Sequence, residues 1–198
     1  MLTPAIDVPA SLAKLRDQYR EDIIKLDEDL DRYRHVIEAD RPEVVVECGT
    51  WEGGSARWFA EAGLDVITID VLRYPKAHGG SKITWLTGST ADADIAAHVR
   101  ELVAGRRTMV VLDSDHSAAH VAAEIRLYAP LVSPGCHLVV EDGILTWMDN
   151  KWFQGSPLDA VEELLVPDPA FERDEAIEAM YPISMYPCGW WIRRIPCS

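Results

Sequence analysis

Acidic residues follow three apolar runs of this sequence, and carboxylates spaced in this way can hold a metal ion. Asp70 ends DVITID, Asp113 follows TMVVL, and Glu141 and Asp142 follow CHLVV. If these runs are parallel strands of one sheet, the acids meet at its carboxyl edge, where open α/β sheets bind ligands. So many carboxylates repel one another unless a cation or a proton offsets their charge. Mg²⁺ is a hard cation that prefers oxygen ligands, and we expect Asp113, Glu141 and Asp142 to bind it.

A glycine-rich turn follows another apolar run, in VVVECGTWEGGS at residues 44–55. Gly49, Gly53 and Gly54 would let the backbone turn sharply and approach a ligand, and Ser55 opens a helical segment whose first N–H groups are free to bind one. The spacing is not the G-x-G-x-x-G of dinucleotide-binding proteins. Asp70, 21 residues after Gly49, is placed to accept hydrogen bonds from ribose hydroxyls. The alternative for the glycines is a turn that binds no ligand, and the alternative for Asp70 is an aspartate in the turn that ends its strand.

These residues lie at the ends of a regular alternation of strands and helices. Apolar runs at 44–46, 65–70, 82–86, 108–112 and 136–140 alternate with helical patterns at 55–62, 91–104, 117–129 and 157–166. The alternation predicts a Rossmann-like, doubly wound, mostly parallel α/β sheet. Two further strands, 180–186 and 189–195, would form a hairpin around Pro187-Cys188 and add an antiparallel C-terminal strand. Ser89 or Thr90 would cap the helix at 91–104, and either could instead face an adenine.

Apolar residues recur at steps of three and four between residues 10 and 38, which predicts one long amphipathic helix or two shorter ones. This segment would pack against the domain or form a homo-oligomeric contact, because the spacing approaches a heptad. We therefore divide the chain into an N-terminal helical segment, 1–40, and a ligand-binding domain, 41–198.

Composition excludes several classes of partner. The 198 residues carry a formal net charge of −14, which argues against nucleic acids and anionic membranes. No apolar run approaches the roughly 18 residues of a membrane span, and the first residues do not resemble a secretion signal. The four cysteines form no C-x-x-C pair, and we expect Cys48 and Cys136 to be reduced core residues of a cytoplasmic protein.

The segment VLDSDHSAAHVAAEIRLYAPLVSPGCHLVVEDG, with VVECGTWEGGS upstream, resembles the cephalosporin hydroxylase family and its relatives, the macrocin-type and rhamnosyl sugar O-methyltransferases. The similarity covers roughly residues 40 to 195. It implies the class I S-adenosylmethionine (SAM) methyltransferase fold, with Glu47 and Gly49 in its first motif. It also implies a magnesium site made by Asp113, Glu141 and Asp142. The expected SAM contacts are Glu47, Gly49, Thr50, Gly53, Gly54, Ser55, Asp70, Ser89 and Asp113. Because the chain is short, we expect it to lack the larger N-terminal domain that some of these enzymes carry.

The resemblance also implies a base, because the sugar methyltransferases use a histidine three residues after the first metal-binding acid. Here that histidine is His116, and a capping or surface role is its alternative. Methyl transfer to a hydroxyl requires removal of its proton, which a cation and a nearby imidazole can promote. Asp115 is the alternative to Asp113 as ligand. The other histidines, His35, His78, His98, His120 and His137, are expected to be surface or strand residues.

The leading hypothesis is a SAM- and Mg²⁺-dependent O-methyltransferase for a small hydroxylated molecule, such as the sugar of a natural product. Two alternatives are a hydroxylase-type oxidoreductase component and a non-catalytic SAM-binding subunit. The sequence shows no pair of histidines with a carboxylate of the kind that binds iron in oxygenases. The aromatic loop at 144–155 would form a substrate lid or pack over the sheet edge, and loops of this kind choose the acceptor.

Overall fold

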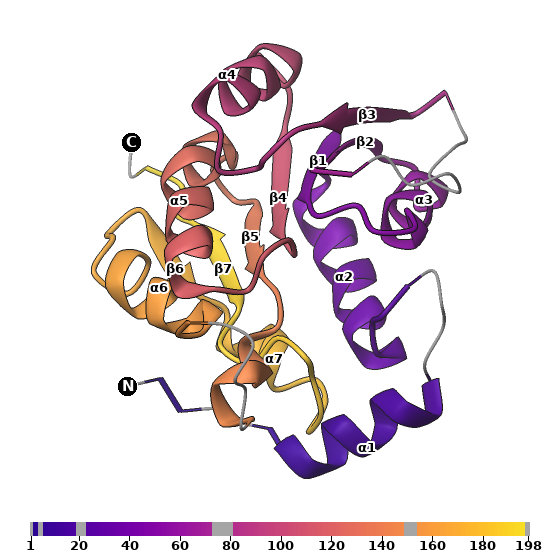
Figure 1. The fold of residues 1–198 in the computed structure, drawn as a ribbon, viewed down its shortest axis with the longest axis vertical. Helices are drawn as coiled ribbons and strands as arrows, with labels where there is room; N and C mark the ends of the chain where they lie inside the picture. The colour runs from indigo at the N-terminus through magenta and orange to yellow at the C-terminus, as the bar shows by residue number, and fades with distance from the viewer. Residues whose placement is uncertain (1, 4–5, 19–22, 73–80, 149–153, 197–198) are drawn as a thin grey trace.

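A seven-stranded sheet forms the centre of the protein (Figure 1). The structure is a computed structural model that describes residues 2–3, 6–18, 23–72, 81–148 and 154–196. The strand order is β3-β2-β1-β4-β5-β7-β6, in which β1 to β5 run parallel and β7 runs antiparallel to β5 and β6. The strands are β1 (Val44–Cys48), β2 (Asp65–Asp70), β3 (Ile83–Thr87), β4 (Thr108–Leu112), β5 (His137–Val140), β6 (Phe171–Arg173) and β7 (Trp190–Arg193). This order confirms the predicted doubly wound, mostly parallel sheet with an antiparallel C-terminal strand.

Helices cover both faces of the sheet, because the central strands are apolar on both sides. One face packs against α4 (Ala93–Leu102), α5 (Ala118–Tyr128) and α6 (Pro157–Leu164). The other packs against α2 (Asp27–Asp40), α3 (Gly54–Glu61) and α7 (Glu175–Glu178). Short 3₁₀ helices, η1 (Ala129–Leu131) and η2 (Gly143–Trp147), follow α5 and β5. Cys48 and Cys136 are free and buried, as expected.

The N-terminal segment forms two helices, α1 (Val8–Gln18) and α2, rather than one. Tyr33 and Val36 of α2 are buried in the core on one face of the sheet, and Leu30 is buried as well. The apolar stripe of α2 therefore packs against its own domain. Within the described residues, no helix has the length and apolarity needed to cross a membrane.

The prediction of a strand at 180–186 was wrong. The strand that pairs with β7 is β6, and the intervening chain holds α7 and irregular backbone. A buried pair on α2, Arg32 with Asp29, explains the difference. The guanidinium of Arg32 donates to four main-chain carbonyls of this region, those of Ile177, Glu178, Tyr181 and Ile183. Asp29 accepts from the Ser184 hydroxyl and the Met185 N–H, at 2.6 and 2.9 Å. Side chains thus form the hydrogen bonds to these backbone groups that a neighbouring strand would form in a sheet.

The predicted caps of α4, Ser89 and Thr90, were also wrong. The helix begins at Ala93, two residues later than predicted, and the side chain of Asp92 accepts from the Asp94 N–H at 2.8 Å. The helix α6 begins with a capping box between Ser156 and Asp159, and Pro157 occupies its first position.

A buried histidine ties β5 to two helices. The Nδ1 of His137 lies 2.7 Å from Asp40 at the end of α2, and its Nε2 lies 3.2 Å from Asp174 before α7. His137 is on a strand, as expected, but it is buried between these two acids. Burial lowers the pKa of His137, but the hydrogen bonds to Asp174 and Asp40 outweigh burial and raise it above its ordinary value.

We expect His137→Gln to destabilise the protein in a pH-dependent way. The native pKa of His137 is raised, so its contribution is fully present below the unfolded pKa of about 6.5 and is lost as pH rises through the native pKa. The variant should lose about 1.5–3 kcal/mol of unfolding free energy at pH 5.5, and less at pH 9. Urea unfolding at both pH values measures the difference. His98→Gln, at an exposed position of α4, is the control. A loss for His137→Gln that is equal at both pH values would contradict the assignment.

Candidate active site

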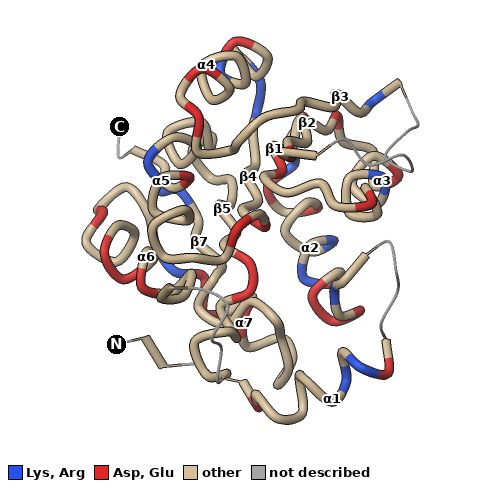
Figure 2. The backbone as a smooth tube through the Cα atoms, viewed as in Figure 1, with Lys and Arg blue, Asp and Glu red and all other residues tan. Residues whose placement is uncertain are grey.

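A cavity of about 550 Å³ opens at the carboxyl ends of β1, β2, β4 and β5. Figure 2 shows acidic residues in the loops after β4 and β5, at the same edge of the sheet. Five of the residues predicted to bind the cofactor line the cavity: Gly49, Thr50, Ser55, Asp70 and Asp113. Four do not line it: Glu47, Gly53, Gly54 and Ser89. The carboxyl edge therefore carries the cavity, as the sequence predicted.

The loop after β1 and the loop after β4 touch at Gly49. A Cβ at this position would lie 1.9 Å from the carbonyl oxygen of Asp113, and Gly49 has a φ of 97°. Only glycine combines this backbone conformation with so close an approach. The N–H of Asp113 also donates to the carbonyl of Cys48, the residue before Gly49, at 2.8 Å.

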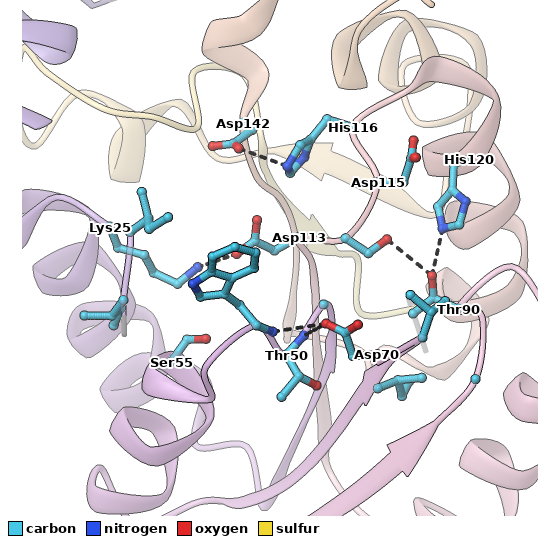
Figure 3. A pocket seen from close by; sticks show the side chains of 18 residues that line it. Lys25, Thr50, Ser55, Asp70, Thr90, Asp113, Asp115, His116, His120 and Asp142 are labelled. Atoms are coloured by element: carbon cyan, nitrogen blue, oxygen red, sulfur yellow. Dashed lines mark hydrogen bonds and ion pairs between the residues drawn. The ribbon is translucent and has the colours of Figure 1, made fainter. Parts of the chain in front are cut away.

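Asp70 organises the glycine loop from the end of β2. One of its carboxylate oxygens accepts from the N–H groups of Thr50 and Trp51, at 3.0 and 3.1 Å (Figure 3). The other accepts from the N–H of Leu72 at 3.0 Å. The carboxylate thus orders the loop and faces the cavity at the same time.

Glu47 lies beneath the glycine loop rather than in the cavity. Its side chain is buried and accepts from the Thr68 hydroxyl at 2.6 Å. Burial raises the pKa of Glu47 to about 7. The Glu47 carboxylate thus supports the glycine loop from below and does not line the cavity in this structure.

Asp113, His116 and Asp142 converge at one side of the cavity. Each offers one ligand atom, and these atoms lie within 4.8 Å of one another. The Nε2 of His116 is 3.3 Å from an oxygen of Asp142 (Figure 3). Burial raises the pKa of Asp142 to about 6. Two carboxylates and an imidazole at this spacing match the donors of a site for a divalent cation.

Glu141, the third predicted metal ligand, does not belong to this converging group. It is buried, accepts from the Tyr33 hydroxyl at 2.6 Å, and forms an ion pair with Lys25. Burial and the nearby charge of Asp113 raise the pKa of Glu141, and the charge of Lys25 acts in the opposite direction. Its carboxylate therefore faces the N-terminal segment, below the cavity.

Lys25 is a site residue that no sequence pattern indicated. Its ammonium contacts Asp113 at 2.8 Å and also contacts Glu141, although its side chain is only 2 % exposed. Burial lowers the pKa of Lys25, but the charges of Asp113 and Glu141 outweigh burial and keep the pKa above its ordinary value. Burial would raise the pKa of Asp113, and the ammonium outweighs this and holds it below the usual range. Lys25 is charged at neutral pH and cannot act as a base.

Asp115 and His120 complete the loop after β4. Asp115 accepts from the N–H of Ser117 at 2.8 Å, in the turn that begins α5, so it is Asp113 whose carboxylate reaches the converging group. His120 lines the cavity, where its Nε2 lies 2.8 Å from the Thr90 hydroxyl, so the expectation of a plain surface position was wrong. The signal for His120 was its place four residues after His116, which puts both near the start of α5.

The aromatic loop is described only in part. Trp147 and Met148 are 37 % and 39 % exposed at the end of η2, while Trp152 and Phe153 lie outside the described residues.

The sequence is similar to a protein family and to curated proteins that carry the same name, rhamnosyl O-methyltransferase. A family model described as "Rhamnosyl O-methyltransferase/CmcI" matches residues 17–195. A rhamnosyl O-methyltransferase of Mycobacterium leprae (strain TN) is 31% identical over 179 residues, which are 84% of this chain and 78% of that protein. One of Mycobacterium tuberculosis (strain ATCC 25618 / H37Rv) is 34% identical over 125 residues, 58% of this chain and 51% of the relative. The chain thus spans about half the length of that curated relative.

Solved structures show the same arrangement of strands and helices. The CmcI-N160 apo-structure has a TM-score of 0.67 at 20% identity and covers 88% of this chain and 74% of its own. The structure of cmcI-D160 with Mg and SAM has a TM-score of 0.66 at 20% identity, with 87% and 74% covered. The structure of MycE with Mg, S-adenosylhomocysteine (SAH) and mycinamycin VI has a TM-score of 0.56 at 21% identity, with 69% and 41% covered.

Proposed function

This chain belongs to the rhamnosyl O-methyltransferase/CmcI family, and from that premise we propose that it transfers a methyl group from SAM to a hydroxyl of a small molecule. Its fold is the class I SAM-dependent methyltransferase fold. The observation that carries the proposal is one cavity with two chemically different ends. One end has Thr50 and Asp70, the other has His116 and Asp142, and Asp113 lies between them (Figure 3).

The cofactor would lie against the glycine loop. Asp70 uses both carboxylate oxygens for N–H groups of the chain, and a carboxylate has about four acceptor positions, so lone pairs remain for ribose hydroxyls. Gly49 keeps the loop close to β4, and Ser55 lies in the first turn of α3 at the cavity wall. Thr90 and His120 also line the cavity, and they are candidates to meet the adenine.

The residues at the other end suit a divalent cation such as Mg²⁺, with Asp113 and Asp142 as its carboxylate ligands. When bound, the cation supplies positive charge that favours ionisation of the acceptor hydroxyl. His116 would hold the proton that the hydroxyl loses, and its ring is kept in place by Asp142 at 3.3 Å. Glu141 would hold Lys25 and Tyr33 in place below this end of the cavity.

We propose a hydroxylated small molecule as acceptor, with a sugar as the first class to test, because MycE was solved with mycinamycin VI and the sequence relatives are rhamnosyl O-methyltransferases. Incubation of the protein with SAM, Mg²⁺ and a panel of free and glycosidic sugars, with SAH as readout, tests this. SAH that forms only in the presence of an acceptor supports methyl transfer. A protein that binds SAH but methylates nothing in a broad panel would favour a binding subunit.

The hydroxylase-type alternative is not favoured. The one metal-ligand group found in the described part of the chain has two aspartates and one histidine, whereas the oxygenase iron triad has two histidines and one carboxylate. A homo-oligomeric contact through residues 10–38 is not favoured, because α2 buries its apolar residues in the core of its own domain.

Replacing Asp70 by alanine should weaken SAH binding by about 1.5–3 kcal/mol, the usual scale of a hydrogen bond to a charged group. The N–H groups of Thr50 and Trp51 lose their acceptor in the same variant, which adds to the loss. Titration calorimetry measures the affinity. Asp65→Ala, at the opposite end of β2, is the control and should bind SAH as the wild type does. Wild-type protein with affinity for NAD and none for SAM or SAH would rule out the cofactor assignment.

A further inference from the structure

A buried ammonium, that of Lys25, lies between the carboxylates of Asp113 and Glu141. Lys25 comes from the chain segment just before α2, and its side chain is 2 % exposed. Its Nζ is 2.8 Å from Asp113 (Figure 3). It also contacts Glu141 and lies 5.5 Å from the centre of the Tyr186 ring. A lysine is almost never so deeply buried unless its charge is paired.

Lys25 contacts two of the acids at the carboxyl edge of the sheet, Asp113 and Glu141. Glu141 faces Lys25 alone among the cations of the described residues, and its other oxygen accepts from Tyr33. Asp113 is shared, since it contacts Lys25 and also belongs to the converging group with His116 and Asp142. Lys25 therefore joins the buried acid to the acid that faces the cavity.

We propose that Lys25 is a positioning residue that acts as a built-in cation, whose ammonium takes the place of a divalent ion between Asp113 and Glu141. This inference rests on the proposed function, because the divalent ion is part of it. The ammonium offsets the buried charge of Glu141 when no metal is present, so the loops after β4 and β5 keep their shape. The ammonium also occupies Asp113 and Glu141, so a metal ion can use only Asp113, His116 and Asp142 as ligands. The affinity of the protein for the metal is therefore lower than it would be without Lys25.

The variant Lys25→Met tests this by removing the ammonium and keeping most of the side-chain volume. Breaking a buried ion pair on one side leaves an uncompensated charge, so we expect the melting temperature in chelator to fall by about 10 °C or more. Saturating Mg²⁺ or Mn²⁺ should restore most of the loss, because the metal can then use Glu141. Calorimetric titration with Mn²⁺ should show at least about tenfold tighter binding than in the wild type. Lys14→Met, at a lysine of α1 whose side chain is 41 % exposed, is the control and should change neither quantity.

The double variant Lys25→Met/Glu141→Gln separates charge compensation from simple packing. It removes the ammonium together with the carboxylate that depends on it, so its melting temperature in chelator should return toward the wild-type value. Its response to metal should be small again, because the carboxylate that the metal would gain is gone.

Three results would overturn the proposal. One is a Lys25→Met protein that stays unfolded at saturating metal, and another is an unchanged affinity for Mn²⁺. The third is a double variant as unstable as the single one. SAH binding, measured on the same samples, keeps this question apart from the proposed function. Wild-type protein that binds no SAH would contradict methyl transfer, and the metal dependence of Lys25→Met would still decide the role of the lysine.

Discussion

His116→Gln is expected to lower methyl-transfer turnover by about 10²–10⁴-fold, the usual effect of losing a general base. His116 is the one imidazole in the converging group with Asp113 and Asp142 among the described residues, and it faces the cavity. Glutamine keeps a polar side chain of similar reach but cannot accept the proton. Affinity for SAH should stay within a few-fold, because His116 lies at the end of the cavity away from the glycine loop. Turnover from initial rates and affinity from calorimetry give the two quantities.

The pH profile of this variant adds a second test. The deficit should shrink as pH rises, because a larger fraction of the acceptor hydroxyl ionises without help from a base. His35→Gln, at an exposed position of α2, should leave the rate and its pH profile unchanged. If His116→Gln turns over at the wild-type rate across the pH range, His116 serves only to shape the start of α5. Asp115 is then the next residue to test.

Asp113→Asn is expected to reduce metal affinity by more than the 10–100-fold that is typical for losing an outer partner of a metal ligand, and to reduce turnover in parallel. The change removes a charged ligand from the converging group and also the partner of Lys25 at 2.8 Å. Wild-type turnover should disappear in chelator and return with added Mg²⁺. Calorimetric titration of metal and initial rates at saturating Mg²⁺ measure the two losses.

Asp115→Asn is the comparison for this prediction, because the two aspartates are two residues apart. Asp115 accepts from the Ser117 N–H and has no place in the converging group, so the variant should lose far less affinity for metal. Equal losses in both variants would mean that the loop after β4 matters as a whole rather than through the ligand at Asp113. Full activity of the wild type under thorough chelation would rule out a metal in the reaction.

The fold could be predicted because local signals agree with the global arrangement. Runs such as Val44–Val46 are apolar on both faces and end in polar or glycine-rich segments, which marks both the strand and the edge where it ends. The carboxyl edge then followed from the parallel order of the strands. This placed Asp70, Asp113 and Asp142 around one cavity.

The remaining features depend on partners far away in the chain. Lys25 meets Asp113 and Glu141 from 88 and 116 residues away, and no local pattern marks such a contact. For the same reason the direction of Glu141 could not be predicted, since adjacent residues at a strand end point to different sides. Residues 180–186 are apolar enough for a strand, but Arg32, about 150 residues earlier, binds their carbonyls. Tertiary contacts override local propensity in both cases.

The close approach of Gly49 to the Asp113 carbonyl has a thermodynamic consequence. With 1.9 Å between that oxygen and the space a Cβ would need, neither loop can shift without moving the other. A cofactor that tightens the loop after β1 therefore changes the position of an acid that faces the metal. Binding of the two ligands should then be cooperative, and linkage requires the coupling to be reciprocal. Whatever factor SAH adds to the affinity for the metal, the metal must add to the affinity for SAH.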